Sequence, residues 1–193
     1  MISTDVPRQV YLLVDGENID RTLGQILGTK PKSNQRPRWD SLKKFVEKKF
    51  DAVCRPLFFL NATQGTSGPF IQALKTVGFL PIPLTSNDPT VKVVDEGILK
   101  TLDALKEKFS GARSPAVVLV SHDADFKEKL NALSDRPIGI VAFKEYLSGE
   151  YELIPSLQVF DLEDDAVAFS GESGPLPRLR NIPIEMFDPY KFI

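Results

Sequence analysis

Acidic residues follow two strand-like segments of the chain at the same relative position. The apolar run 10–14 ends directly in Asp15, and the apolar run 116–120 is followed closely by Asp123 and Asp125. Ligands of open α/β sheets bind outside the carboxyl ends of the strands, so we expect these carboxylates at one sheet edge. One aspartate there can simply cap the next helix, but capping needs only one of the second pair. Carboxylates crowded together repel one another, and such clusters normally persist only when a cation offsets the repulsion.

A further carboxylate, Asp95, belongs to the same expected group. It precedes Ile98, Leu99 and Leu102 by three, four and seven residues, which places it on the apolar stripe of a helix. Capping of that helix is the alternative role. Three or four carboxylates without a Cys or His cluster suit Mg²⁺ or Mn²⁺ rather than Zn²⁺. Such ions activate water and neutralise charge on a phosphodiester, so the pattern predicts metal-dependent hydrolysis.

The elements that must position these acids alternate between strand and helix patterns. This alternation predicts βαβ units and an α/β fold with a mostly parallel sheet. Helical periodicity marks the segments 19–27, 39–46, 70–77 and 98–109, with a short helix after Asp123. The expected strands are 10–14, 53–60, 79–84, 116–121, 138–143 and 157–160.

Composition is that of an ordinary globular domain. Hydrophobic residues make up 42% and charged residues 26% of the 193 positions, which is enough for one sizeable core. Apolar runs reach only five or six residues, far below the roughly 20 that a membrane helix needs. No signal-like apolar stretch precedes Val10, so we expect a cytoplasmic protein. The single cysteine, Cys54, lies in an apolar segment and is expected to be a buried thiol.

The net charge of −2 argues against binding nucleic acid through global charge, so any phosphate contact must be local. A basic segment before the second helix has no acidic residue among its charges and is the best candidate for such contact. A solvated loop of the same composition is the alternative. The basic residues are Lys30, Lys32, Arg36 and Arg38.

At this point the sequence resembles the NYN family, a branch of the PIN-like metal-dependent ribonucleases. Three blocks in this order carry the resemblance, which covers roughly residues 9 to 162. They are Val14-Asp15-Gly16-Glu17-Asn18-Ile19, then Lys92 with Asp95, and then Ser121-His122-Asp123-Ala124-Asp125-Phe126.

The resemblance implies a PIN-like three-layer sandwich with about five or six strands. It implies that Asp15, Asp95, Asp123 and Asp125 form the catalytic metal site, which cleaves RNA to leave a 5′-phosphate. We expect the polar neighbours of the acids to contact substrate: Asn18, Lys92, Ser121 and His122.

The chain also departs from the family pattern at two positions. A glycine usually stands where His122 does, and a second acid often stands where this chain has Thr101. The ligand count is therefore open. His122 could support a carboxylate, contact RNA or simply lie on the rim.

Two other functions compete with a ribonuclease. A noncatalytic or weakly active nucleic-acid-binding module could keep the same fold and some of the carboxylates. A haloacid dehalogenase-like phosphatase would need Asp-x-Asp after the first strand, where this chain has Glu17 as the second acid. A Walker-type nucleotide site is excluded, because no glycine-rich loop ends in Gly-Lys-Ser or Gly-Lys-Thr.

The C-terminal part differs in composition from the rest. We predict a nuclease domain over residues 1–162, followed by an arm over residues 163–193. In that arm the segment 163–180 is rich in Gly, Pro, Ser and acids, which predicts a linker, and 182–193 is apolar again. We expect the apolar end to dock, with a homodimer contact favoured over docking in cis or binding another partner.

Overall fold

The computed structural model describes residues 8–111, 114–169, 174–178 and 184–191. Its centre is one six-stranded sheet in which every neighbouring pair is parallel, in the order β3-β2-β1-β4-β5-β6. The strands are β1 (Gln9–Asp15), β2 (Val53–Asn61), β3 (Leu80–Leu84), β4 (Ala116–Val120), β5 (Ile138–Ala142) and β6 (Leu157–Asp161).

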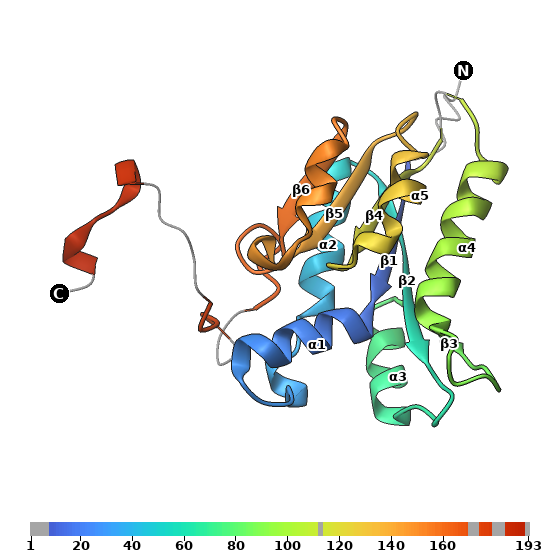
Figure 1. The fold of residues 1–193 in the computed structure, drawn as a ribbon, viewed down its shortest axis with the longest axis horizontal. Helices are drawn as coiled ribbons and strands as arrows, with labels where there is room; N and C mark the ends of the chain where they lie inside the picture. The colour runs from blue at the N-terminus through green and yellow to red at the C-terminus, as the bar shows by residue number, and fades with distance from the viewer. Residues whose placement is uncertain (1–7, 112–113, 170–173, 179–183, 192–193) are drawn as a thin grey trace, which may run out of the picture.

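Helices cover both faces of this sheet and complete a three-layer α/β sandwich (Figure 1). The helices α1, α2 and α3 bury their apolar side chains in the core on one face, while α4 and α5 do so on the other. The predicted fold class is confirmed. The helices are α1 (Gly16–Leu27), α2 (Trp39–Phe50), α3 (Gly68–Thr76), α4 (Val93–Lys108) and α5 (Lys127–Asn131).

The central strands β1 and β4 lie side by side, although more than 100 residues separate their ends along the chain. Connections from β1 run outward through β2 to one edge, and connections from β4 run outward through β5 to the other. The strand order therefore reverses between β1 and β4, and ligands of doubly wound sheets bind at such a switch point. Asp15 ends β1 there, and Asp123 follows β4 after two residues.

Alternating side chains of β1 feed the two cores, as a central strand requires. Val10, Leu12 and Val14 belong to the α1 side, whereas Leu13 belongs to the α4 side. Cys54 is buried on the α1 side, as expected from its apolar segment.

The predicted linker over residues 163–180 is wrong for the part that the structure describes. Ala166, Ala168, Phe169 and Leu176 are buried in the core on the α1 side. The guanidinium of Arg178 is also buried, and it pairs with three acids of the domain, Glu145, Asp161 and Glu163. Packing therefore continues well past the predicted boundary at residue 162, because this segment covers apolar surface that the helices leave open.

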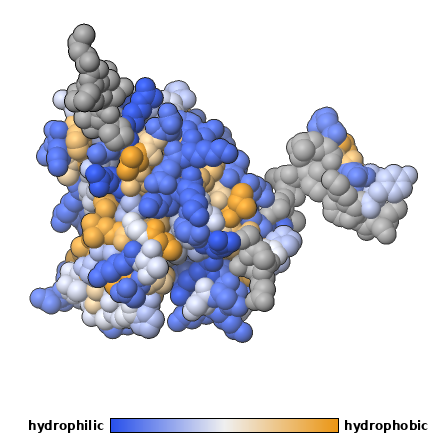
Figure 2. Space-filling model, turned by 180° about the vertical axis from the view of Figure 1, so that it is seen from behind, coloured by the Kyte–Doolittle hydropathy of each residue, from blue (hydrophilic) through white to orange (hydrophobic). Residues whose placement is uncertain are grey.

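The final described segment, 184–191, stands apart from the body of the domain (Figure 1; Figure 2). Ile184 and Tyr190 are 77% and 83% exposed. Docking of this arm, on a second copy or elsewhere, stays a prediction. None of the helices in the described ranges is both long and apolar enough to cross a membrane.

Candidate metal centre

Three carboxylates meet beside the switch point of the sheet. Asp95, Asp123 and Asp125 each offer one oxygen, and these oxygens lie within 4.8 Å of one another. Asp95 comes from the first turn of α4, whereas the other two flank the start of a short 3₁₀ turn (Ala124–Phe126) after β4. Sequence reasoning predicted this convergence, because each acid follows a strand or opens a helix at the same edge.

Asp15 lies beside this trio rather than within it. It lines the same hollow, of about 240 Å³, as Asp95 and Asp123. One carboxylate oxygen accepts the N–H of Asn18 at 3.0 Å, and the other accepts the hydroxyl of Ser121 at 3.1 Å. Asp15 therefore also caps α1, so the capping role and the site role coincide in one residue.

Burial sets the charge state of the acids at this edge. It raises the pKa of Asp15 from its ordinary 3.8 to about 6, with a smaller contribution from the charge of Asp95, against the hydrogen bonds that lower it. Burial also raises the pKa of Asp95 and of the neighbouring Glu17. Negative charge is thus poorly compensated around the hollow, and a cation placed there would be stabilised.

One cation of the protein itself approaches the trio. The ammonium of Lys92 lies 3.3 Å from Asp95 and 3.5 Å from Asp125, and its side chain is 69% exposed. The hydrogen bond and charge of Asp95 raise the pKa of Lys92. This long exposed side chain can move away without disturbing the core. Its predicted contact with substrate stays a prediction.

His122 and Ser121 are buried and do not line the hollow, so the structure gives no support to their predicted contact with substrate, which stays a prediction. The Ser121 hydroxyl accepts the N–H of Asp123 at 3.2 Å while donating to Asp15, so it ties two acids together. The ring of His122 stacks on Phe143, with centroids 5.6 Å apart. Both residues support the site from behind, since β4 carries them into the interior before the chain turns outward at Asp123.

The hydrogen bonds of His122 define its tautomer. Its Nε2 accepts the backbone N–H of Phe143 at 2.9 Å, so the ring proton resides on Nδ1. Nδ1 then donates to the Asn18 Oδ1 at 2.8 Å and lies 3.2 Å from the hydroxyl of Thr22. Burial lowers the pKa of His122 to about 4, which keeps the ring neutral near pH 7.

These bonds also orient Asn18. Its Oδ1 accepts both the backbone N–H and the ring N–H of His122, each at 2.8 Å. The amide nitrogen of Asn18 makes no hydrogen bond to any described residue. It is not fully buried, because every fully buried side-chain nitrogen among the described residues has a partner. Because Asn18 lines the hollow, this nitrogen is available to donate to a molecule bound there.

The four predicted basic residues do not act together. Arg36 is committed to a bidentate pair with Asp20, with its Nε 3.0 Å from Oδ1 and its terminal nitrogen 2.6 Å from Oδ2, so its predicted role on substrate is not supported. Arg38 lies 3.4 Å from Asp40. Lys30 and Lys32 are exposed, and their contact with RNA stays a prediction.

Sequence reasoning missed three polar residues of the hollow. Glu17, Arg21 and Asn61 line it together with the acids. Arg21 lies three residues beyond Asn18 on α1, so helical spacing from that predicted site residue could have indicated it. Asn61 ends β2 next to β1, and only the strand order brings it near.

Comparison with known proteins adds a fold and no function. No protein-family model matches the chain, and no curated protein matches it. Among solved structures, the chain is similar to a protein of unknown function from Vibrio parahaemolyticus. The two share 16% identity and a TM-score of 0.61, over 85% of this chain and 98% of the other.

Proposed function

We propose that the protein is a metal-dependent endoribonuclease of the NYN kind, which hydrolyses RNA phosphodiesters at this centre with Mg²⁺ or Mn²⁺. One observation carries the proposal: three carboxylate oxygens lie within 4.8 Å of one another at the switch point of the sheet, beside a fourth acid. Nothing else among the described residues gathers three such ligands.

The donor set fits a hard cation. All three ligands are carboxylates, and oxygens up to 4.8 Å apart suit an ion with ligand bonds of about 2.0 to 2.6 Å. The exposed Lys92 would give up its place to such an ion. When bound, the ion would supply an activated water and charge neutralisation on the phosphate.

The protein's own groups contribute binding and orientation. Asn18 holds an amide N–H toward the hollow, where it can donate to a phosphate oxygen whose negative charge grows during hydrolysis. Arg21 lines the same hollow and has a guanidinium suited to a phosphate. Tyr151 donates its hydroxyl to the carbonyl of Asp123 and so fixes the turn that presents that acid.

Cleavage of an end-labelled single-stranded RNA, with Mn²⁺ and with EDTA, tests the proposal. We expect cleavage only with metal, and a loss of at least about a hundredfold in Asp123→Asn, because a ligand of the cation is removed. The matched control is Asp103→Asn, which changes an acid of α4 that pairs with Lys129 outside the hollow. Full activity of Asp123→Asn would contradict the proposal.

A noncatalytic RNA-binding module is the second candidate, supported by the ammonium of Lys92 at the position that a cation would take. Thermal unfolding with Mn²⁺ distinguishes the two. A bound ion at about 100 times its dissociation constant stabilises the fold by about 2.7 kcal/mol. For an enzyme, Mn²⁺ should stabilise the wild-type fold by this amount and should not stabilise Asp123→Asn. RNA binding with neither stabilisation by Mn²⁺ nor cleavage would favour the noncatalytic module.

A further inference from the structure

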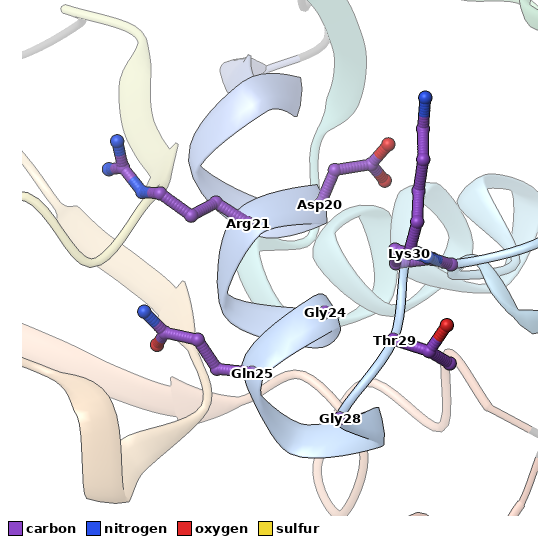
Figure 3. Close-up of a pocket in the computed structure, with 8 residues that line it drawn as sticks. Asp20, Arg21, Gly24, Gln25, Gly28, Thr29 and Lys30 are labelled. Atoms are coloured by element: carbon purple, nitrogen blue, oxygen red, sulfur yellow. The ribbon is translucent and has the colours of Figure 1, made fainter.

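A second hollow lies over the C-terminal half of α1 and is unlike the acidic one. Its volume is about 510 Å³. Gly24 in α1 and Gly28 directly after it contribute no side chain to the floor of this hollow (Figure 3). Arg21 and Gln25 project on one side of this floor, and Lys30 rises on the other. We call this hollow the α1 groove.

The α1 groove is cationic. Among the described residues of its lining the one acid is Asp20, whose charge is offset by the bidentate pair with Arg36. Across the described ranges, neither Arg21 nor Lys30 enters any ion pair. Two positive charges therefore flank an uncharged floor, an arrangement suited to a polyanion.

The groove and the acidic hollow share a wall. Arg21 lines both, and α1 begins at the metal centre, where Asp15 caps it. With a rise of 1.5 Å per residue, Gly24 and Gly28 lie about 12 and 18 Å along the helix from Gly16. A strand held at the acids could continue past Arg21 into the groove within a few nucleotides.

We propose that the α1 groove binds the nucleotides of single-stranded RNA that flank the cleaved bond. This inference rests on the proposed function. Arg21 would hold the phosphate between the two hollows in a bidentate pair, and Lys30 the next phosphate outward. The bare floor lets the sugar approach the helix, whose last carbonyl groups can accept ribose 2′-hydroxyls.

The lining also indicates how selective this contact is. None of the described residues that line the groove is aromatic, so base stacking on them does not contribute. Contacts to phosphate and sugar carry no direct sequence information. The groove should therefore favour longer RNA without preferring particular bases.

Two variants test the groove separately from catalysis. Arg21→Gln removes its shared charge, and Gly24→Gln fills the floor. A side-chain carbon at Gly24 meets nothing closer than 3.5 Å, so the fold should tolerate it. Matched controls are Lys48→Gln, an exposed charge of α2, and Gly149→Gln, whose added carbon meets open space.

We measure binding of labelled RNA by fluorescence anisotropy in EDTA, where cleavage cannot interfere. For RNA of roughly 16 nucleotides, both variants should bind about tenfold more weakly, while Gly24→Gln should have little effect on RNA of roughly 4 nucleotides. Arg21→Gln should lower the slope of log affinity against log salt by about 0.7, and Gly24→Gln should leave it unchanged.

If both variants bind long RNA as tightly as the wild type, the proposal that the α1 groove binds RNA is wrong, whatever the cleavage assay shows. If wild-type protein binds RNA through the groove but cleaves nothing with Mn²⁺, the proposed function fails while the groove stands. Equal weakening in the Lys48→Gln and Gly149→Gln controls would also overturn it, because the effect would then be nonspecific.

Discussion

At the residue scale, Asn18 and His122 form a pair whose geometry has a functional consequence. The neutral ring and the backbone N–H of His122 occupy the Asn18 carbonyl oxygen, which leaves the amide nitrogen for the hollow. We interpret His122 as a positioning residue, acting through Asn18 rather than on the substrate. It occupies the position where the family that the sequence resembles usually has glycine, so this support would be particular to this chain.

A double-mutant cycle tests that pair. His122→Phe keeps a ring to stack on Phe143 but removes the ring's hydrogen bonds to Asn18, Thr22 and the backbone of Phe143. We expect kcat for RNA cleavage to fall about 10²- to 10³-fold in Asn18→Ala, the usual loss for an oxyanion donor, and by a smaller factor in His122→Phe.

The double variant should be no worse than Asn18→Ala, because both changes act through one amide. Multiplicative losses would show that the two residues act independently. His122→Gln, which can restore a donor toward Asn18, should recover part of kcat, and a purely structural role would not predict this recovery.

The acids themselves were predictable from sequence, but their division of labour was not. Strand ends and helical spacing place Asp15, Asp95, Asp123 and Asp125 at one edge of the sheet. Which of them share an oxygen cluster depends on side-chain direction. Two hydrogen bonds hold the Asp15 carboxylate outside the cluster; their donors are the Asn18 N–H in α1 and the Ser121 hydroxyl after β4.

At the element scale, α1 packs closely on the sheet at its first residue. Gly16 makes this close approach possible. A side-chain carbon there would lie 2.7 Å from the Phe58 Cζ and nearer still to another ring atom. That ring cannot yield easily, because Trp39, Phe70 and Phe79 pack around it.

We therefore expect Gly16→Ala to lower the free energy of unfolding by about 1 to 3 kcal/mol, the usual cost of overpacking. It should also reduce RNA cleavage, since the turn of α1 that carries Asp15 and Asn18 must shift. Urea unfolding and the cleavage assay measure both effects. Gly149→Ala, whose added carbon meets nothing, is the control, and equal stability of the two variants would refute the packing argument.

Element prediction from sequence succeeded where apolar periodicity carried the signal. All six strands appear within two residues of their expected bounds, because each contains an apolar run of strand length bounded by polar or turn residues. The segment after residue 162 failed for the opposite reason. Its composition is polar, and the pairing of Arg178 with Asp161 and Glu163 joins residues that no local pattern connects.

At the scale of the whole molecule, Arg178 fastens the C-terminal segment to the sheet. Its guanidinium lies 2.6 Å from Asp161 and 3.1 Å from Glu163, and it stacks over Phe143 at 4.9 Å. Burial alone would raise the pKa of Asp161, but hydrogen bonds from Arg178 and from backbone N–H groups hold that pKa well below its ordinary value.

We expect Arg178→Gln to lower the free energy of unfolding by about 3 to 5 kcal/mol at pH 7, because buried acids lose their partner. The depressed pKa of Asp161 gives stability above about pH 4, its unfolded value, and this stability disappears as pH falls through the folded value. The difference in the free energy of unfolding between wild type and Arg178→Gln should therefore become smaller toward pH 2, as urea unfolding would show.

Lys144→Gln, which changes a half-exposed pair with Asp165, is the control and should cost at most about 1 kcal/mol. A difference between Arg178→Gln and wild type that stays constant from pH 7 to pH 3 would contradict the electrostatic account.

The position of Arg178 late in the chain also bears on biosynthesis. Asp161 ends β6, and Arg178 follows 17 residues later, so a ribosome adding about 5 to 20 residues per second makes it about one to three seconds afterwards. A chain that lacks Arg178 would have acids destined for burial without this counter-charge, and Phe143 without the guanidinium that stacks over it. The fold should therefore close only after this arginine has been added, and translation that stops before it should yield an aggregation-prone product.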